Sequence, residues 1–173
     1  MNQEVATSLL YHIDDDALSL GHAPEATRDW LKSLGLPVDL LQFMMFNWAQ
    51  ADGHIGAVDI LCSKAIPEQE DVDVYVTHKL LPVGSGPNGD RFVIDYSTDS
   101  CPVGFVTSSE YGGEGDPREF FRTAARSVES FLYRIAEGRF YPCEYYETGA
   151  FNEFLRAEAG HDAFPPYAPR QSP

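Results

Sequence analysis

Residues that could bind a metal ion lie close together near the N-terminus. His12 is followed by the acidic run Asp14-Asp15-Asp16, and oxygen-rich sets of this kind suit hard divalent cations. The run lacks the glycine and the distant Glu of an EF-hand calcium loop. We therefore interpret it as a solvated acidic segment. A small metal-dependent enzyme that uses His12, Asp14 and Asp16 is the alternative.

A glycine pattern in the middle of the chain has the spacing of a dinucleotide-binding loop. Gly84, Gly86 and Gly89 fit that spacing, but the loop needs a helix N-terminus directly after it to hold the pyrophosphate. The residues that follow, Arg91 to Tyr96, alternate and are rich in β-formers, and Pro87-Asn88-Gly89 has turn chemistry. The segment predicts a β-hairpin, and we expect no cofactor.

No arrangement of nucleophile, base and orienting group is visible, and the chain has no phosphate-binding loop, HExxH or GxSxG motif. Its cysteines, Cys62, Cys101 and Cys143, are odd in number and far apart, which argues against a disulfide framework or a zinc site. The N-terminus shows no secretory signal, and no apolar run approaches the roughly 20 residues of a membrane span. We expect a reduced, cytoplasmic protein without catalytic residues.

Acidic residues outnumber basic ones and are unevenly placed. The chain has 27 Asp and Glu against 12 Lys and Arg, a net charge of −15. This balance argues against binding to nucleic acid or to an anionic membrane, and an acidic surface attracts basic partners. Residues 1–117 hold 19 acids and 5 bases, whereas residues 118–173 hold 8 and 7. The acids that we expect to contact a partner form three groups: Asp14, Asp15 and Asp16; Glu68, Glu70, Asp71 and Asp73; and Glu110, Glu114 and Asp116.

The elements that must position these groups follow from periodicity. Helical signals predict a helix that begins at Pro24 and stops at Gly35, and a second, core helix from Leu36-Pro37 to Trp48. Alternation predicts strands at 72–76, 79–83, 91–96 and 103–106. Asp116-Pro117 then begins a long amphipathic helix that ends at Gly138, with Arg118, Arg122 and Arg126 on one ridge. A last helix is expected over 148–159.

This order predicts an α+β fold, in which an antiparallel β-meander packs with N-terminal and C-terminal helices. We divide the chain into an N-terminal extension (1–22), a single domain (23–160) and a proline-rich C-terminal tail (161–173). The high negative charge favours a monomer or a weak dimer.

The order of several short motifs resembles the SUKH superfamily. The matching features are Leu36-Pro37 at the start of the core helix, Asp52-Gly53 after it, the Leu81 to Gly84 strand with its glycine-rich turn, the strand 92–96, and a Pro-Val-Gly-Phe-Val strand before a helix with paired aromatics. Together they span residues 24–137.

The resemblance implies a non-catalytic, cytoplasmic immunity protein that binds and neutralises a bacterial toxin domain. The acidic half of the chain indicates that such a toxin would be cationic. An intracellular regulatory or scaffold domain is the alternative within the same family.

Overall fold

The computed structural model describes residues 1–13, 18–55, 58–86, 89–107 and 111–136. The candidate residues Asp14, Asp15, Asp16 and Glu110, the helix expected over 148–159 and the tail 161–173 lie outside this part of the chain. The helices described are α1 (Gln3–Ile13), α2 (Glu25–Ser33), α3 (Val38–Phe46), α4 (Val72–Thr77), the short 3₁₀ helix η1 (Pro117–Phe120) and α6 (Val128–Ala136). The strands are β1 (Gly53–Ile55), β2 (Val58–Ile60), β3 (Leu80–Ser85), β4 (Arg91–Asp95), β5 (Val103–Val106) and β6 (Phe121–Ala125).

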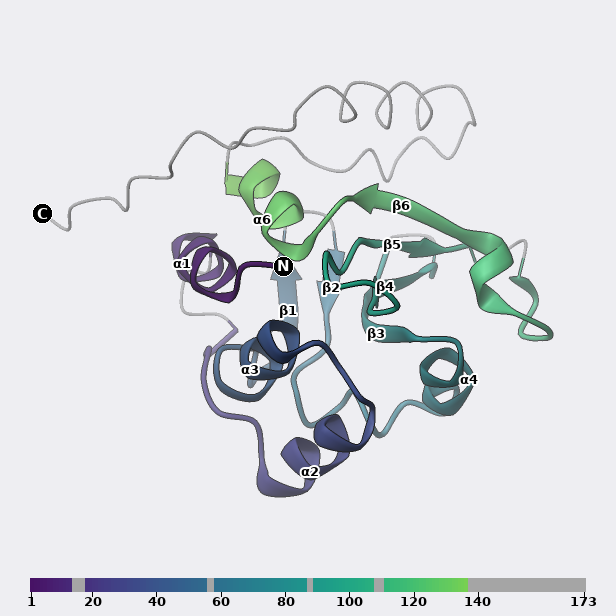
Figure 1. The fold of residues 1–173 in the computed structure, drawn as a ribbon, viewed down its shortest axis with the longest axis horizontal. Coiled ribbons are helices and arrows are strands. Elements are labelled where there is room, and N and C mark those ends of the chain that lie inside the picture. The colour runs from purple at the N-terminus through teal and green to yellow at the C-terminus, as the bar shows by residue number, and fades with distance from the viewer. Residues whose placement is uncertain (14–17, 56–57, 87–88, 108–110, 137–173) are drawn as a thin grey trace, which may run out of the picture.

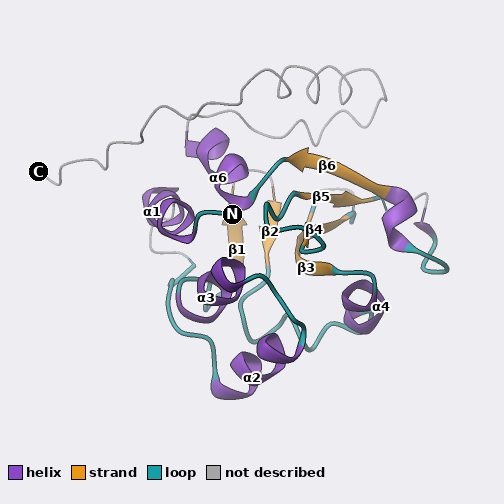
Figure 2. Cartoon of the chain, in the orientation of Figure 1, coloured by secondary structure: helices purple, strands orange, loops and turns teal. Residues whose placement is uncertain are grey.

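The six strands form one antiparallel sheet in chain order, from β1 to β6. Each strand pairs with the next one along the chain, so the sheet is a meander. The predicted α+β class with a β-meander is confirmed, and Figure 2 shows the strands together with the helices around them. Strands β3 and β4 pair antiparallel, as the predicted hairpin requires.

Helices cover the two faces of the sheet unequally. The main core gathers apolar side chains of α1, α2, α3 and α6 against Leu81, Phe92 and Phe105 of the strands. The other face carries a smaller cluster, in which Leu80 and Val93 pack with side chains of α4 and of the segment before η1. Figure 1 shows α4 and this segment on one side of the molecule, and α1, α2 and α3 on the other.

The first two predicted helices are confirmed in α2 and α3. Gly35 takes a positive φ of 68° after α2, which suits the residue that ends a helix. In α3, Leu40, Phe43 and Met44 are fully buried, as expected of a core helix. The helix ends at Phe46, however, and Trp48 follows it with its indole N–H donating to the carbonyl of Leu61.

The strand predicted over 72–76 is wrong, because these residues form the helix α4. Val72, Val74 and Val76 alternate, but Val72 and Tyr75 are three apart and are the residues that α4 buries. A segment of only six residues can satisfy both the helical and the strand period. Packing of α4 against β3 therefore determines that it is a helix.

The long helix predicted from Asp116 to Gly138 is also wrong, because β6 interrupts it. Phe121 to Ala125 pair with β5, which satisfies backbone groups that β5 would otherwise leave at an open edge. The helix α6 begins only at Val128, where Ser127 Oγ accepts a hydrogen bond from the N–H of Ser130. Arg118, Arg122 and Arg126 therefore lie on different segments and form no helical ridge.

Three elements were not predicted. Helix α1 packs against α6 and α3, and its Ala6, Leu9 and Leu10 are part of the main core. Strands β1 and β2 are three residues each. Such short strands carry too few residues for alternation to indicate them.

Candidate functional site

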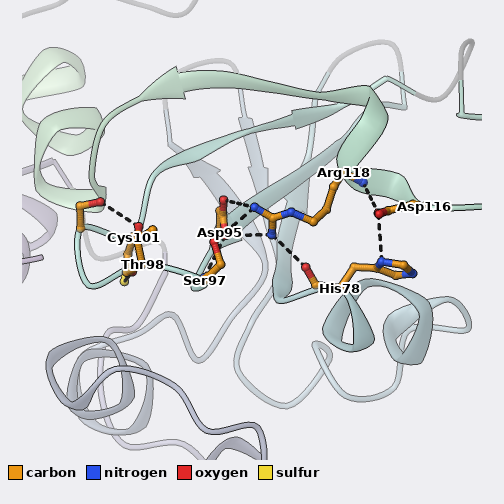
Figure 3. Close-up of polar contacts among 8 residues, drawn as sticks. His78, Asp95, Ser97, Thr98, Cys101, Asp116 and Arg118 are labelled. Carbon is orange, nitrogen blue, oxygen red and sulfur yellow. Dashed lines mark hydrogen bonds and ion pairs between the residues drawn. The ribbon is translucent and has the colours of Figure 1, made fainter.

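A partly buried ion pair ties the end of β4 to η1 on the less covered face of the sheet. Arg118 Nη2 donates to Asp95 Oδ2 at 2.7 Å and Arg118 Nη1 to Asp95 Oδ1 at 3.1 Å, a bidentate arrangement. Burial alone would raise the pKa of Asp95, but hydrogen bonds from Arg118 and Ser97 outweigh it, so the pKa is lowered. Asp95 therefore stays ionised and holds η1 in place (Figure 3).

The same arginine reaches α4. Arg118 Nη1 also donates to the carbonyl oxygen of His78, which follows the last residue of α4, at 2.9 Å. Asp116 Oδ1 accepts from the backbone N–H of Arg118 at 2.8 Å, as expected of an N-cap, and lies 2.9 Å from His78 Nδ1. Figure 3 shows His78 and Arg118 on either side of Asp116. These contacts hold α4 beside the segment that leads into η1.

This arrangement brings two of the predicted acidic groups together. Four acids lie in or just before α4, and two precede η1; because the two segments are held side by side, they share one end of the molecule (Figure 1). We call this surface the acidic end: Glu68, Glu70, Asp71, Asp73, Glu114 and Asp116.

Its members differ in their surroundings. Glu68, Glu70, Asp73 and Glu114 are exposed, whereas Asp71 and Asp116 are partly buried and bound to neighbours. Asp71 Oδ2 accepts from Arg91 Nη2 at 2.7 Å. The four exposed acids form no ion pair with other described residues, so their charges face solvent uncompensated.

A cleft of ≈ 360 Å³ adjoins the acidic end and shares Asp71 with it. Three glycines line it, together with side chains from α4 and the residue before it, from β4 and β5, and from the segment after residue 110. These side chains are Asp71, Val74, Tyr75, Arg91, Val106 and Tyr111. The rings of Tyr75 and Tyr111 meet edge to face, with centroids 6.0 Å apart. We call it the tyrosine cleft.

Burial and nearby negative charge in the tyrosine cleft raise the pKa of both tyrosine hydroxyls. Burial, with Asp71 as the next cause, raises the pKa of Tyr75 to about 12. Burial and the charges of Asp71 and Asp116 also raise the pKa of Tyr111. Both side chains are therefore neutral hydroxyls at physiological pH, able to donate or accept hydrogen bonds.

Sequence reasoning identified Asp71 but missed Tyr75, Arg91 and Tyr111. Asp71 and Tyr75 are four apart, which places them on one side of a helix. That signal was hidden because the segment resembles a strand. Tyr111 reaches the cleft only through the tertiary contacts of η1, which local sequence does not indicate.

The cysteines described are Cys62, which is partly exposed, and Cys101, which is buried. Burial raises the pKa of the Cys101 thiol to about 11, and its Sγ lies 3.5 Å from the carbonyl oxygen of Thr98. The thiol therefore packs in the core as a neutral group.

In the ranges that the structure describes, no group of three or more His, Cys, Asp or Glu side chains is placed to hold a metal ion. Of the alternative metal set, His12 lies in α1, and Asp14 and Asp16 lie outside these ranges. Among the described helices, none has the length and apolar character required to traverse a bilayer.

Comparison of the chain with models of protein families, with curated proteins and with solved structures finds no match.

Proposed function

We propose that this protein binds a cationic protein partner through the acidic end. The observation that carries the proposal is the joining of α4 to the segment before η1, which gathers acids from two distant parts of the chain. Residues 68–78 contain 4 acids and no Lys or Arg. A concentrated field of one sign speeds the encounter with a partner of the opposite sign and rejects partners of the same sign.

Two arginines beside this surface support the proposal, because ion pairs hold both of them. Arg91 binds Asp71, and Arg118 binds Asp95. Neither guanidinium is directed outward as an isolated charge that would repel a cationic partner. The exposed acids Glu68, Glu70 and Asp73, in contrast, enter no ion pair among the described residues and present their charges to such a partner.

The class of partner follows from the resemblance to the SUKH superfamily. On that basis we propose an immunity protein of the bacterial cytoplasm, which acts as a monomer or weak dimer and neutralises a cationic toxin by covering part of it. Nucleic acid is not the proposed partner, because its phosphates would meet the same negative field.

Coexpression in bacteria with a toxin-like protein encoded beside the gene for this chain tests the proposal. The wild-type protein is expected to restore growth. The variant E68K/E70K/D73K is expected to protect less, because it reverses the field at the acidic end.

The matched control is D29K/D39K/D99K, which changes the net charge equally at exposed residues of α2, α3 and the turn after β4. Equal protection by both triple variants would contradict a role for the acidic end. Absence of protection by the wild-type protein would contradict the immunity function.

A further inference from the structure

The charged and hydroxyl groups that line the tyrosine cleft are paired with neighbours or buried away from its opening. Asp71 Oδ2 accepts from Arg91 Nη2 at 2.7 Å, and Arg91 Nη1 lies 3.3 Å from Gln69 Oε1. The hydroxyl of Tyr111 and Oδ1 of Asp71 have almost no accessible surface. Because opposite charges this close largely cancel at a distance, the described lining favours neither a cation nor an anion inside the cleft.

The surface that remains open to a ligand is mostly carbon and bare backbone. Val74 is 39% exposed, whereas most large apolar side chains described are buried. Gly112 and Gly113 carry no side chains, and a Cβ atom built on either would meet nothing within 4 Å. Tyr75 and Tyr111 are almost fully buried and form the floor. A neutral, apolar side chain fits such a wall, because its burial separates no charge from water.

The volume of the cleft limits the size of this ligand. At ≈ 360 Å³ it is near the lower end of small-ligand pockets, which span about 300–1,000 Å³. It has room for one large side chain and is too narrow for a helix of a partner, about 10 Å across. Aromatic side chains bury the largest areas and lose few rotamers on binding. Arg91, whose side chain is 26% exposed, adds a guanidinium that attracts the face of an aromatic ring.

The rim of the cleft is acidic, which indicates what should flank this side chain. Glu70, Asp73 and Glu114 are each next in sequence to a residue that lines the cleft, and all three are exposed. An apolar pocket inside a polar rim is the usual arrangement at the centre of a protein interface. Charge complementarity therefore favours a partner residue that has Lys or Arg beside it.

We propose that the tyrosine cleft receives one aromatic side chain of the cationic partner, flanked by basic residues that contact Glu70, Asp73 and Glu114. This inference rests on the proposed function and assigns the anchoring contact to it. The acids steer the partner and mainly set the association rate, whereas a buried aromatic anchor mainly sets the dissociation rate.

Titration with short peptides tests the cleft without the partner. We would follow the backbone amide NMR signals of Gly112 and Gly113 while adding acetyl-Lys-Phe-Lys amide, acetyl-Lys-Ala-Lys amide or acetyl-Glu-Phe-Glu amide. The Lys-Phe-Lys peptide is expected to give saturable shifts at millimolar concentrations and to bind about tenfold more tightly than Lys-Ala-Lys, through burial of the ring. Glu-Phe-Glu should bind more weakly than Lys-Phe-Lys. Sodium chloride should weaken both cationic peptides and leave their affinity ratio unchanged, because the ring carries no charge.

Val74 and Val5 provide a matched pair of variants, because they are 39% and 38% exposed and lie in the helices α4 and α1. V74A removes two methyl groups at the cleft and is expected to weaken Lys-Phe-Lys about fivefold. V5A removes the same groups elsewhere and should leave binding unchanged. Equal affinities of the phenylalanine and alanine peptides, or equal binding by V74A and V5A, would overturn the proposal. A cleft that admits only water gives the first of these results.

Kinetics with the partner separate this proposal from the proposed function. V74A is expected to raise the dissociation rate about fivefold and to leave the association rate unchanged. E68K/E70K/D73K is expected to slow association. Slowed association in the charge variant together with unchanged dissociation in V74A would refute the anchor and retain the proposed function. If the charge variant associates as fast as the wild type, the proposed function fails, and the peptide titration still decides whether the cleft accepts an aromatic side chain.

Discussion

Arg118 and Asp95 form a bidentate ion pair across 23 residues of sequence, with N–O distances of 3.1 and 2.7 Å. The carboxylate is buried, and its side chain is 9% exposed against 33% for the arginine. The pair holds η1 and α4 together on the less covered face of the sheet. This is because the same guanidinium also donates to the carbonyl oxygen of His78, directly after α4. The acidic end depends on it, since its two segments meet there.

Replacement of Asp95 by Asn is expected to lower the free energy of unfolding by about 2 kcal/mol, the contribution of hydrogen bonds to a charged group. Arg118 would lose its charged partner and keep only neutral acceptors. Urea denaturation at neutral pH measures the loss. The control is D29N, which removes an exposed pair with Lys32 on α2 and is expected to change little. Equal effects in the two variants would contradict the structural role of Asp95.

The pH dependence of the same pair has a defined sign. The folded-state pKa of Asp95 lies below its ordinary value of 3.8. Such a group contributes stability above the unfolded-state pKa, and that contribution is lost as the pH falls through the folded-state pKa. The stability difference between wild type and D95N is therefore expected to be constant above about pH 5 and to shrink below about pH 4. A difference that stays constant down to the acid transition would contradict this assignment.

A close backbone approach between β5 and β6 requires glycine at position 104. A Cβ atom there would lie 2.1 Å from the carbonyl oxygen of Arg122. G104A is expected to destabilise the protein by about 3 kcal/mol, because the strands must separate to admit the methyl group. The control is G21A, whose Cβ would meet only Gln50 Cγ at 3.8 Å. Similar melting temperatures for the two variants would contradict the pairing of β5 with β6.

The hydroxyl of Tyr111 is expected to contribute nothing favourable to stability. Its hydroxyl is buried without a partner among the described residues, and burial of such a group opposes folding. Y111F should therefore be as stable as the wild type, or more stable by about 1 kcal/mol. Thermal unfolding provides the measurement. A clear loss of stability in Y111F would show that the hydroxyl has a hydrogen-bond partner in the folded protein.

The two described thiols are expected to differ in reactivity. Burial raises the pKa of Cys101 to about 11, and the side chain is 0% exposed, whereas Cys62 is partly exposed. Because the thiolate is the reactive form, iodoacetamide at mildly alkaline pH should label Cys62 before Cys101. Peptide mass spectrometry would follow both sites. Labelling of Cys101 at the rate of Cys62 without denaturant would contradict the packing around β5.

Local chemistry explains which elements could be predicted from sequence. The hairpin between β3 and β4 was predictable because turn residues and alternating strands lie next to each other in the chain. The segment of α4 satisfies both helical and strand periods, and the segment of β6 continues the helical period of the residues around it. Their conformations are decided by partners elsewhere: α4 by packing on β3, and β6 by the open edge of β5.

Only the negative charge of the candidate site was predictable from the sequence. The acids of 68–73 and 114–116 stand out in the sequence, but their proximity depends on the contacts of Arg118 and Asp116 with His78. The tyrosine cleft needs Tyr75 from α4 and Tyr111 from the segment before η1 to meet. No local pattern indicates that contact, which follows from the way η1 docks on the sheet.

The most direct test of recognition through the acidic end is the association rate of the protein with the proposed cationic partner as sodium chloride is increased. The rate is expected to fall steeply with salt for the wild type, and E68K/E70K/D73K should associate several-fold more slowly at low salt, with a flatter dependence. D29K/D39K/D99K should stay close to the wild type. An association rate that does not change with salt, or that is equal in all three proteins, would contradict recognition through the acidic end.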